Sequence, residues 1–243
     1  MNVYAASSAY PLRIEGRPDD DLSRWRWLVK WLLLIPHFVV LLFLWLAFVA
    51  VTVAAFFAIL VTGRHPQALF EFKVGVLRWT WRVVFYGYNA LGTDRYPPFT
   101  LADVPEYPAG LDVERPEELS RGLVLVKWWL LALPHYLVVG VFVGGAWAGM
   151  NAANGDVGWI FGGGLIGLMA VIAGVVLLVT RRYPRSIFDF IMGMNRWTFR
   201  VLAYGALMTD AYPPFRLDMG GPEPMLEVGG PEVAPPAPAA GVS

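Results

Sequence analysis

Arginine side chains recur at helical spacing in two segments of the sequence, residues 70–99 and 188–215. In each segment an acid, a glycine and two arginines follow one another at steps of four, three and four residues: Glu71, Gly75, Arg78 and Arg82, then Asp189, Gly193, Arg196 and Arg200. These steps place the four side chains on one face of a helix. Guanidinium groups bind phosphates and carboxylates, so this face could hold anionic lipid headgroups.

More basic residues recur in the two halves, and we expect them to crowd one membrane surface. They are Arg24, Lys30, Arg64, Arg121, Lys127, Arg181 and Arg182. A basic residue near an anionic membrane contributes about 1 kcal/mol to binding. In the alternative interpretation the arginines pair within the fold, with Glu71, Asp94, Asp189 or Asp210. Both can hold, because a guanidinium has enough donors for an acid and a phosphate together.

Two histidines, His37 and His135, each follow a proline near the start of an apolar segment. Two equivalent histidines could hold a haem iron or a metal ion between them. In the alternative interpretation each ring hydrogen-bonds a backbone carbonyl left free by its neighbouring proline. The two interpretations differ in whether the rings face each other.

Catalytic signatures are absent from the sequence, which has no cysteine and no HExxH, GxSxG, P-loop or GxGxxG pattern. Asp94 and Asp210 occur in the repeated pattern D-x-YPPF. Because Pro-Pro cannot continue a helix, we expect these acids to cap a turn that closes a helix rather than to act as acid-base groups. The sequence therefore predicts no catalytic residue, no metal site and no cofactor.

Composition indicates a membrane protein, since 57% of the residues are hydrophobic and 15% are aromatic. The formal net charge of zero argues against nucleic acid as a partner, because that role needs a basic excess. Residues 1–16 lack the basic-then-apolar layout of a secretory signal, so we expect internal segments to drive insertion. The expected partners are membrane lipids, with other membrane proteins or a second copy of the chain as further candidates.

The arginine-bearing segments are expected to form amphipathic helices at residues 68–91 and 186–208. A crossing would place two arginines of each helix in hydrocarbon, at about 2.5–3.5 kcal/mol per charge. We therefore expect both helices to lie flat on the cytoplasmic membrane surface. This orientation would put the rings of Trp79, Trp81, Tyr86, Trp197 and Tyr204 at headgroup depth.

Long apolar runs precede these helices. Residues 31–62 are too long for a straight crossing, so they form either one tilted crossing, whose start bends at Pro36 and lies in the interface, or a hairpin that turns near residues 45–52. In the second half, a polar loop at residues 151–156 separates arms at 128–150 and 159–180, which predicts a two-crossing hairpin. If both halves return to their starting side, the positive-inside rule places both termini of a multi-pass cell-membrane protein in the cytoplasm.

Short alternating segments near residues 10–15, 99–101, 111–113 and 215–217 predict a small β element outside the bilayer, built from both halves; the alternative is extended proline-rich loops. We divide the chain into a flexible start (1–9), a first membrane repeat (10–106), a second membrane repeat (107–218) and a disordered tail rich in Pro, Ala and Gly (219–243). The predicted fold is an all-α integral membrane protein of two tandem repeats, each a membrane hairpin plus an interfacial amphipathic helix, with a minor β element at the cytoplasmic face.

Several motifs occur twice in the same order: LSR, KW…PH, TGRHP with TRRYP, RWTWR with RWTFR, and D-x-YPPF. Together they resemble an uncharacterised bacterial membrane family, catalogued as domain of unknown function 4389, in two tandem copies over residues 10–217. The chain departs from an exact repeat at Arg181, where the first copy has Gly63, and in the glycine-rich extension around residues 151–164. The resemblance implies an integral membrane protein and transfers no activity, ligand or catalytic residue.

Three functions are compatible with these features. The first is a non-enzymatic membrane component that binds lipid or protein, which the arginine stripes and the missing catalytic motifs favour. The second is a small-solute transporter or channel, because internal duplication creates a site at the repeat interface in many transporters. The third is a bis-histidine haem or metal protein built on His37 and His135.

Overall fold

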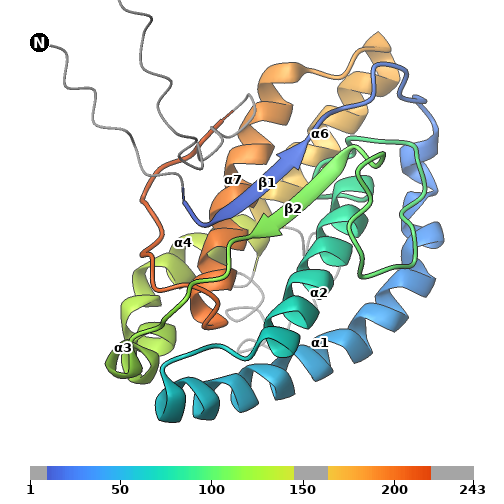
Figure 1. The fold of residues 1–243 in the computed structure, drawn as a ribbon. Coiled ribbons are helices and arrows are strands. Elements are labelled where there is room, and N and C mark those ends of the chain that lie inside the picture. Colours follow the sequence, from blue (N-terminus) through green and yellow to red (C-terminus); the bar gives the residue numbers. More distant parts are fainter. Residues whose placement is uncertain (1–9, 145–163, 220–243) are drawn as a thin grey trace, which may run out of the picture.

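The computed structural model describes residues 10–144 and 164–219 (Figure 1). The predicted flexible start at 1–9, the predicted loop at 151–156 and all but the first residue of the predicted tail lie outside the described residues. The described chain is mostly helical, with one small sheet of two strands.

Helix α1 spans Lys30–Thr62 without interruption. At 1.5 Å per residue this helix is about 50 Å long. Pro36 falls in its second turn, and the helix ends at Gly63, whose φ of 73° lies in the left-handed region. The hairpin alternative for residues 31–62 is therefore wrong, because no Gly, Pro or Asn interrupts the run between Pro36 and Gly63.

The corresponding part of the second repeat is broken. Helix α3 (Arg121–Val126), the π-helical turn η2 (Lys127–Leu131) and helix α4 (Leu133–Val143) form a pair of segments bent by 47°. The second repeat has one more residue than the first between its Lys-Trp and its Pro-His. A π-helical turn accommodates one extra residue, so the insertion explains η2. Helix α6 (Gly164–Thr180) follows the undescribed segment.

The two arginine-bearing helices are confirmed as helices. They are α2 (Gln67–Tyr86) and α7 (Arg185–Gly205), and each begins after a proline. Both end earlier than expected, at Tyr86 and Gly205, with Gly87 and Ala206 as their C-caps. A short 3-10 turn, η1 (Arg26–Leu28), precedes α1.

The predicted β element is confirmed in part. Strand β1 (Leu12–Gly16) pairs antiparallel with β2 (Ala109–Val113), and Ile14 faces Leu111 at the centre of the register. The segments beside Phe99 and Phe215 are not strands. Each of these follows a Pro-Pro pair, which has no N–H groups to donate to a ladder.

With the boundary between the repeats placed between residues 106 and 107, each strand packs on the arginine-bearing helix of the other repeat. Strand β2 packs on α2, and β1 packs on α7. Arg78 Nε of α2 donates to the Leu111 carbonyl at 2.9 Å, and Arg196 Nε of α7 donates to the Ile14 carbonyl at 3.4 Å. The sheet therefore joins the two repeats into one unit.

The core lies between the sheet and the apolar helices. In its middle α2 and α7 pack through aromatic rings, with centroids of Trp81 and Phe199 at 5.6 Å and of Phe85 and Phe188 at 6.1 Å. Helix α1 packs on α2, while α4 and α6 pack on α7. Figure 1 shows the sheet crossing in front of α2 and α7. The fold thus has three layers: the sheet, the α2–α7 pair, and α1 with α4 and α6.

Candidate functional site

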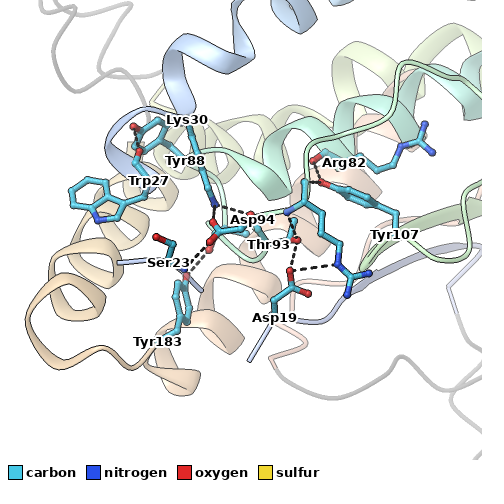
Figure 2. Close-up of polar contacts among 12 residues, drawn as sticks. Asp19, Ser23, Trp27, Lys30, Arg82, Tyr88, Thr93, Asp94, Tyr107 and Tyr183 are labelled. Atoms are coloured by element: carbon cyan, nitrogen blue, oxygen red, sulfur yellow. Dashed lines mark hydrogen bonds and ion pairs between the residues drawn. The ribbon is translucent and has the colours of Figure 1, made fainter. Parts of the chain in front are cut away.

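A buried lysine lies at the start of α1 in the first repeat (Figure 2). Lys30 Nζ donates to the Thr93 carbonyl at 2.6 Å and lies 3.1 Å from Asp94 Oδ1. Asp94 Oδ2 accepts the backbone N–H of Ser23 at 2.6 Å, and the Lys30 ammonium also lies 4.7 Å from the centre of the Tyr86 ring. This cluster fixes the D-x-YPPF turn against the start of α1.

The second repeat builds the same cluster. Lys127 Nζ lies 2.6 Å from Asp210 Oδ1 and 3.0 Å from the Thr209 carbonyl. Asp210 Oδ2 accepts the N–H of Ser120 at 2.6 Å, and Lys127 lies over the Tyr204 ring. Asp94 and Asp210 were expected to cap the turns that close the helices, whereas their carboxylates bind a lysine and a serine N–H of a distant segment. Their partners are lysines, however, rather than the arginines that the sequence suggested.

Both histidines lie in aromatic cages. His37 Nδ1 accepts the indole N–H of Trp79 at 3.0 Å, and its ring stacks on Phe99 with centroids 3.9 Å apart. His135 Nδ1 accepts from Trp197 at 3.1 Å, and its ring stacks on Phe215 at 4.1 Å. Each histidine therefore contacts the helix and the YPPF turn of its own repeat.

These contacts bear on the haem alternative. A neutral imidazole that accepts at Nδ1 carries its proton on Nε2. Nε2 is buried without a hydrogen-bond partner in both His37 and His135. Among the described residues, no group of three or more His, Cys, Asp or Glu side chains could hold a metal ion. Histidine is fixed here by tryptophan, not by the carbonyl that the sequence suggested.

The arginine stripe faces the protein's own chain. Arg82 donates to the Ala102 carbonyl at 2.9 Å and to the Thr100 carbonyl. Arg200 lies 2.5 Å from Asp218 Oδ2, and Arg196 donates to the Asp218 carbonyl at 2.7 Å. All three side chains are buried. In each repeat they hold the segment after YPPF against the helix.

Arg78 and Gly75, on the same face of α2, also contact the protein's own chain. Arg78 bridges the Leu111 carbonyl and Asp112 Oδ1, the latter at 2.6 Å. A Cβ at Gly75 would lie 2.8 Å from Leu101 Cβ, so glycine allows the segment after YPPF to approach the helix. Glu71 is exposed and accepts from Gln67, and Asp189 is half-buried. Neither acid pairs with the stripe arginines in the contacts described above.

The aromatic residues of α2 and α7 correct a further prediction. Trp79, Trp81, Tyr86, Trp197 and Tyr204 are all buried inside the protein. Their expected position at headgroup depth is therefore wrong. The sheet covers one side of α2 and α7 and the apolar helices cover another, which leaves little of either helix on the surface.

The remaining basic candidates lie at the ends of the apolar helices. Arg64, Arg121, Arg181 and Arg182 are exposed, and Arg24 is half-buried. Arg64 Nη2 lies 3.6 Å from Glu118 in a pair that is exposed on both sides. Such exposed pairs contribute little to stability, so these guanidinium groups are available to other anions.

Lys73 is a buried charged residue that the sequence analysis missed. Its Nζ donates to the Ala206 carbonyl at 2.7 Å, and burial, reinforced by Lys127, lowers its pKa to about 7. The equivalent position of the second repeat is Ile191, so a search for repeated motifs passes over it. Burial likewise raises the pKa of Tyr107, whose hydroxyl donates to the Arg95 carbonyl at 3.1 Å.

An apolar cavity of about 580 Å³ opens between α1 and α7. Its walls include Phe48 and Phe56 of α1, Trp128 of η2 and Ala206 after α7. The two hydroxyls in its lining are both engaged, because Thr52 donates to Phe48 O and Tyr136 donates to Trp128 O. The cavity therefore suits an apolar occupant.

The fold and these clusters define a duplicated helical protein whose repeats are joined by a two-stranded sheet. The family model described as Domain of unknown function (DUF4389) matches residues 24–100 and 157–216, which is more than half of the chain. The protein belongs to this family. The two matched segments agree with tandem copies. No curated protein and no solved structure matches the chain.

Proposed function

We propose that the protein is a non-enzymatic component of the cell membrane that binds anionic lipid. The observation that carries this proposal is the exposed apolar surface of α1. This helix is long and apolar enough to cross a membrane, and little of it is buried. Phe43, Leu46, Phe57 and Val61 are 60–73% exposed.

The exposed surface continues over the second repeat. Large apolar residues are exposed along η2, α4 and α6, among them Trp129, Leu137, Leu168 and Val179. A soluble monomer rarely exposes a contiguous apolar patch larger than a few hundred Å². A lipid environment removes the free-energy cost of this surface, and a partner membrane protein would cover part of it in the same way.

The charges support a cytoplasmic side for both ends of the chain. Exposed arginines gather at the ends of the apolar helices, where the positive-inside rule favours the cytoplasm. Tyr10 and Asp218, near the two ends of the described chain, both contact Arg200. We therefore propose that both termini lie on one side.

The cavity gives less support to the transporter alternative. A pathway for a polar solute needs a polar lining, and the hydroxyls of Thr52 and Tyr136 are already bonded to the backbone. The haem alternative also has less support, because the indole N–H groups of Trp79 and Trp197 donate to Nδ1 of the two histidines, which leaves the proton on Nε2, the nitrogen that would ligate an iron.

Flotation tests the proposal. The full chain is mixed with vesicles of zwitterionic lipid, alone or with an anionic fraction. A variant with glutamine at Arg64, Arg121, Arg181 and Arg182 should still float. The increase in its vesicle binding on adding anionic lipid should be at least tenfold smaller than in wild type, because each charge contributes about 1 kcal/mol. The control variant carries glutamine at Arg13 and Arg17. Equal anionic dependence in wild type and the first variant would contradict lipid binding by these arginines, and failure to float at all would contradict membrane association.

A further inference from the structure

We infer that the protein inserts into a single leaflet, with its helices in the membrane plane. The outer faces of α1, α4 and α6 would enter the acyl chains, and the β1–β2 sheet would stay in water. The partner is thus one leaflet of phospholipid with anionic headgroups. This inference rests on the proposed function and replaces the multi-pass topology predicted from the sequence.

The first argument is the internal symmetry. Strands β1 and β2 pair about Ile14 and Leu111, and both send their buried side chains to the same face of the sheet. A twofold axis that exchanges two such antiparallel strands must be perpendicular to the sheet. The same axis exchanges Arg78, which donates to Leu111, with Arg196, which donates to Ile14. It therefore relates the helices of the two repeats as well, and these helices run across it (Figure 1).

The second argument is that the two ends of this axis differ in chemistry. At the sheet end, Arg13, Glu15 and Asp112 alternate with buried apolar residues and point away from the core. Helices α1, α4 and α6 pack on α2 and α7 rather than on the sheet, and their exposed side chains are large and apolar. They are Phe43, Leu46, Val49, Val53 and Phe57 on α1, Leu133, Leu137 and Val141 on α4, and Leu168, Ile172 and Val175 on α6. The molecule is amphipathic along its symmetry axis.

A crossing orientation conflicts with this arrangement. Trp79 in the second half of α2 contacts His37 of α1, and Lys73 in its first half lies 5.9 Å from the Phe48 ring of α1. Arg78, which lies between Lys73 and Trp79, and Trp81, just beyond Trp79, both contact the backbone of the sheet. If α1 stood along the membrane normal, the charged sheet would lie beside the first half of α1 and partly within the hydrocarbon, where charges are unfavourable. With the symmetry axis along the normal, all of these charges stay outside.

Charges at the helix ends agree with the in-plane orientation. Arg24 and Arg26 precede α1. The Tyr183 hydroxyl donates to the Ala90 carbonyl, which brings Arg181 and Arg182 to the same end of α1. At the other end of α1, the Leu119 N–H donates to the Gly63 carbonyl at 2.8 Å, which brings the start of α3 beside Arg64. An in-plane α1, about 50 Å long, places both basic ends among the headgroups of one leaflet.

Cysteine accessibility tests the orientation, because the natural sequence has no cysteine. Single variants Arg13→Cys, Arg24→Cys, Arg64→Cys and Phe43→Cys are expressed as the full chain in cell membranes. Sealed right-side-out and inside-out vesicles then react with a membrane-impermeant maleimide. The cysteine-free chain gives the background, and detergent-solubilised samples show that each thiol is reactive.

We expect the cysteines at positions 13, 24 and 64 to react from the same side, at least tenfold faster than from the other side. The cysteine at position 43 should react from neither side until detergent is added. Labelling of positions 24 and 64 from opposite sides would overturn the in-plane orientation while leaving membrane association intact. A chain that stays in the soluble fraction, with a freely reactive cysteine at position 43, would overturn the proposed function itself.

Discussion

Lys127 and Asp210 are 83 positions apart in the chain and form an ion pair of 2.6 Å in the interior. The side chain of Lys127 has no exposed surface, whereas that of Asp210 is 25% exposed. Lys30 and Asp94 repeat this pair in the first half at 3.1 Å. The pair connects the start of α1 in the first repeat, and the start of η2 in the second, to the turn that follows the arginine-bearing helix.

The two partners of this pair should differ in their effect on stability. Asp210→Ala leaves a fully buried ammonium without its carboxylate, and we expect it to lower the free energy of unfolding by about 3–5 kcal/mol. Lys127→Met should cost less, because Asp210 is partly exposed and keeps the Ser120 N–H. Thermal unfolding in detergent, followed by circular dichroism, measures the difference. An equal cost for the two variants would contradict the burial argument.

The glycines of the stripe provide a matched pair. A Cβ at Gly75 would lie 2.8 Å from Leu101 Cβ and 3.1 Å from its carbonyl oxygen. At Gly193 the nearest atom is Met219 Cγ at 3.1 Å, in a flexible side chain. We expect Gly75→Ala to destabilise the protein by about 1–3 kcal/mol through overpacking. Gly193→Ala should be near neutral, because alanine favours the helix by up to about 1 kcal/mol. Unfolding temperatures in one detergent compare them; a larger loss for Gly193→Ala would be inconsistent with this packing.

His65, in the turn between α1 and α2, should make stability depend on pH. Burial, reinforced by the charge of Lys73, lowers its pKa from 6.5 to about 4. Because the folded-state pKa lies below the unfolded value, its contribution to stability is complete above pH 6.5 and is lost as the pH falls from 6.5 through 4. The loss should be on the order of 1–3 kcal/mol. The lowered pKa of Lys73, about 7, makes stability depend on pH above pH 7 instead.

The control for this pH dependence comes from the second repeat, where Tyr183 occupies the equivalent position. His65→Tyr keeps an aromatic ring and removes the titrating group. Unfolding temperatures between pH 4.5 and 8 should therefore change less in the variant than in wild type. The same slope in both proteins would assign the pH dependence to other groups.

Local patterns in the sequence predicted much of the fold. The repeated arginine stripe predicted α2 and α7, because helical spacing is a short-range signal. The alternation at Leu12 and Ile14 and at Leu111 and Val113 predicted the paired strands for the same reason. The extra residue before Pro134 was visible in the repeat, and its consequence, the π-helical turn η2, follows from local geometry.

The partners of the charged residues were not predictable in this way. Lys30 and Lys127 were predicted to lie at the membrane surface, yet both are buried against acids that come near the end of the same repeat in the sequence. Spacing places a residue on a helix face but does not say what covers that face. The stripe arginines illustrate this, because the chain after YPPF covers Arg82 and Arg200. Long-range packing decides between a lipid phosphate and a backbone carbonyl as the partner of a guanidinium group.

The central claim is that the outer face of α1, α4 and α6 lies among acyl chains while the sheet stays in water. Cross-linking with phospholipids that carry a photoreactive group on the acyl chain, followed by mass spectrometry of the full chain, tests it most directly. We predict cross-links at exposed apolar residues such as Phe43, Leu46 and Leu137, and none on β1 or β2. Cross-links at Arg13 or Asp112, or their absence from α1, would contradict the claim.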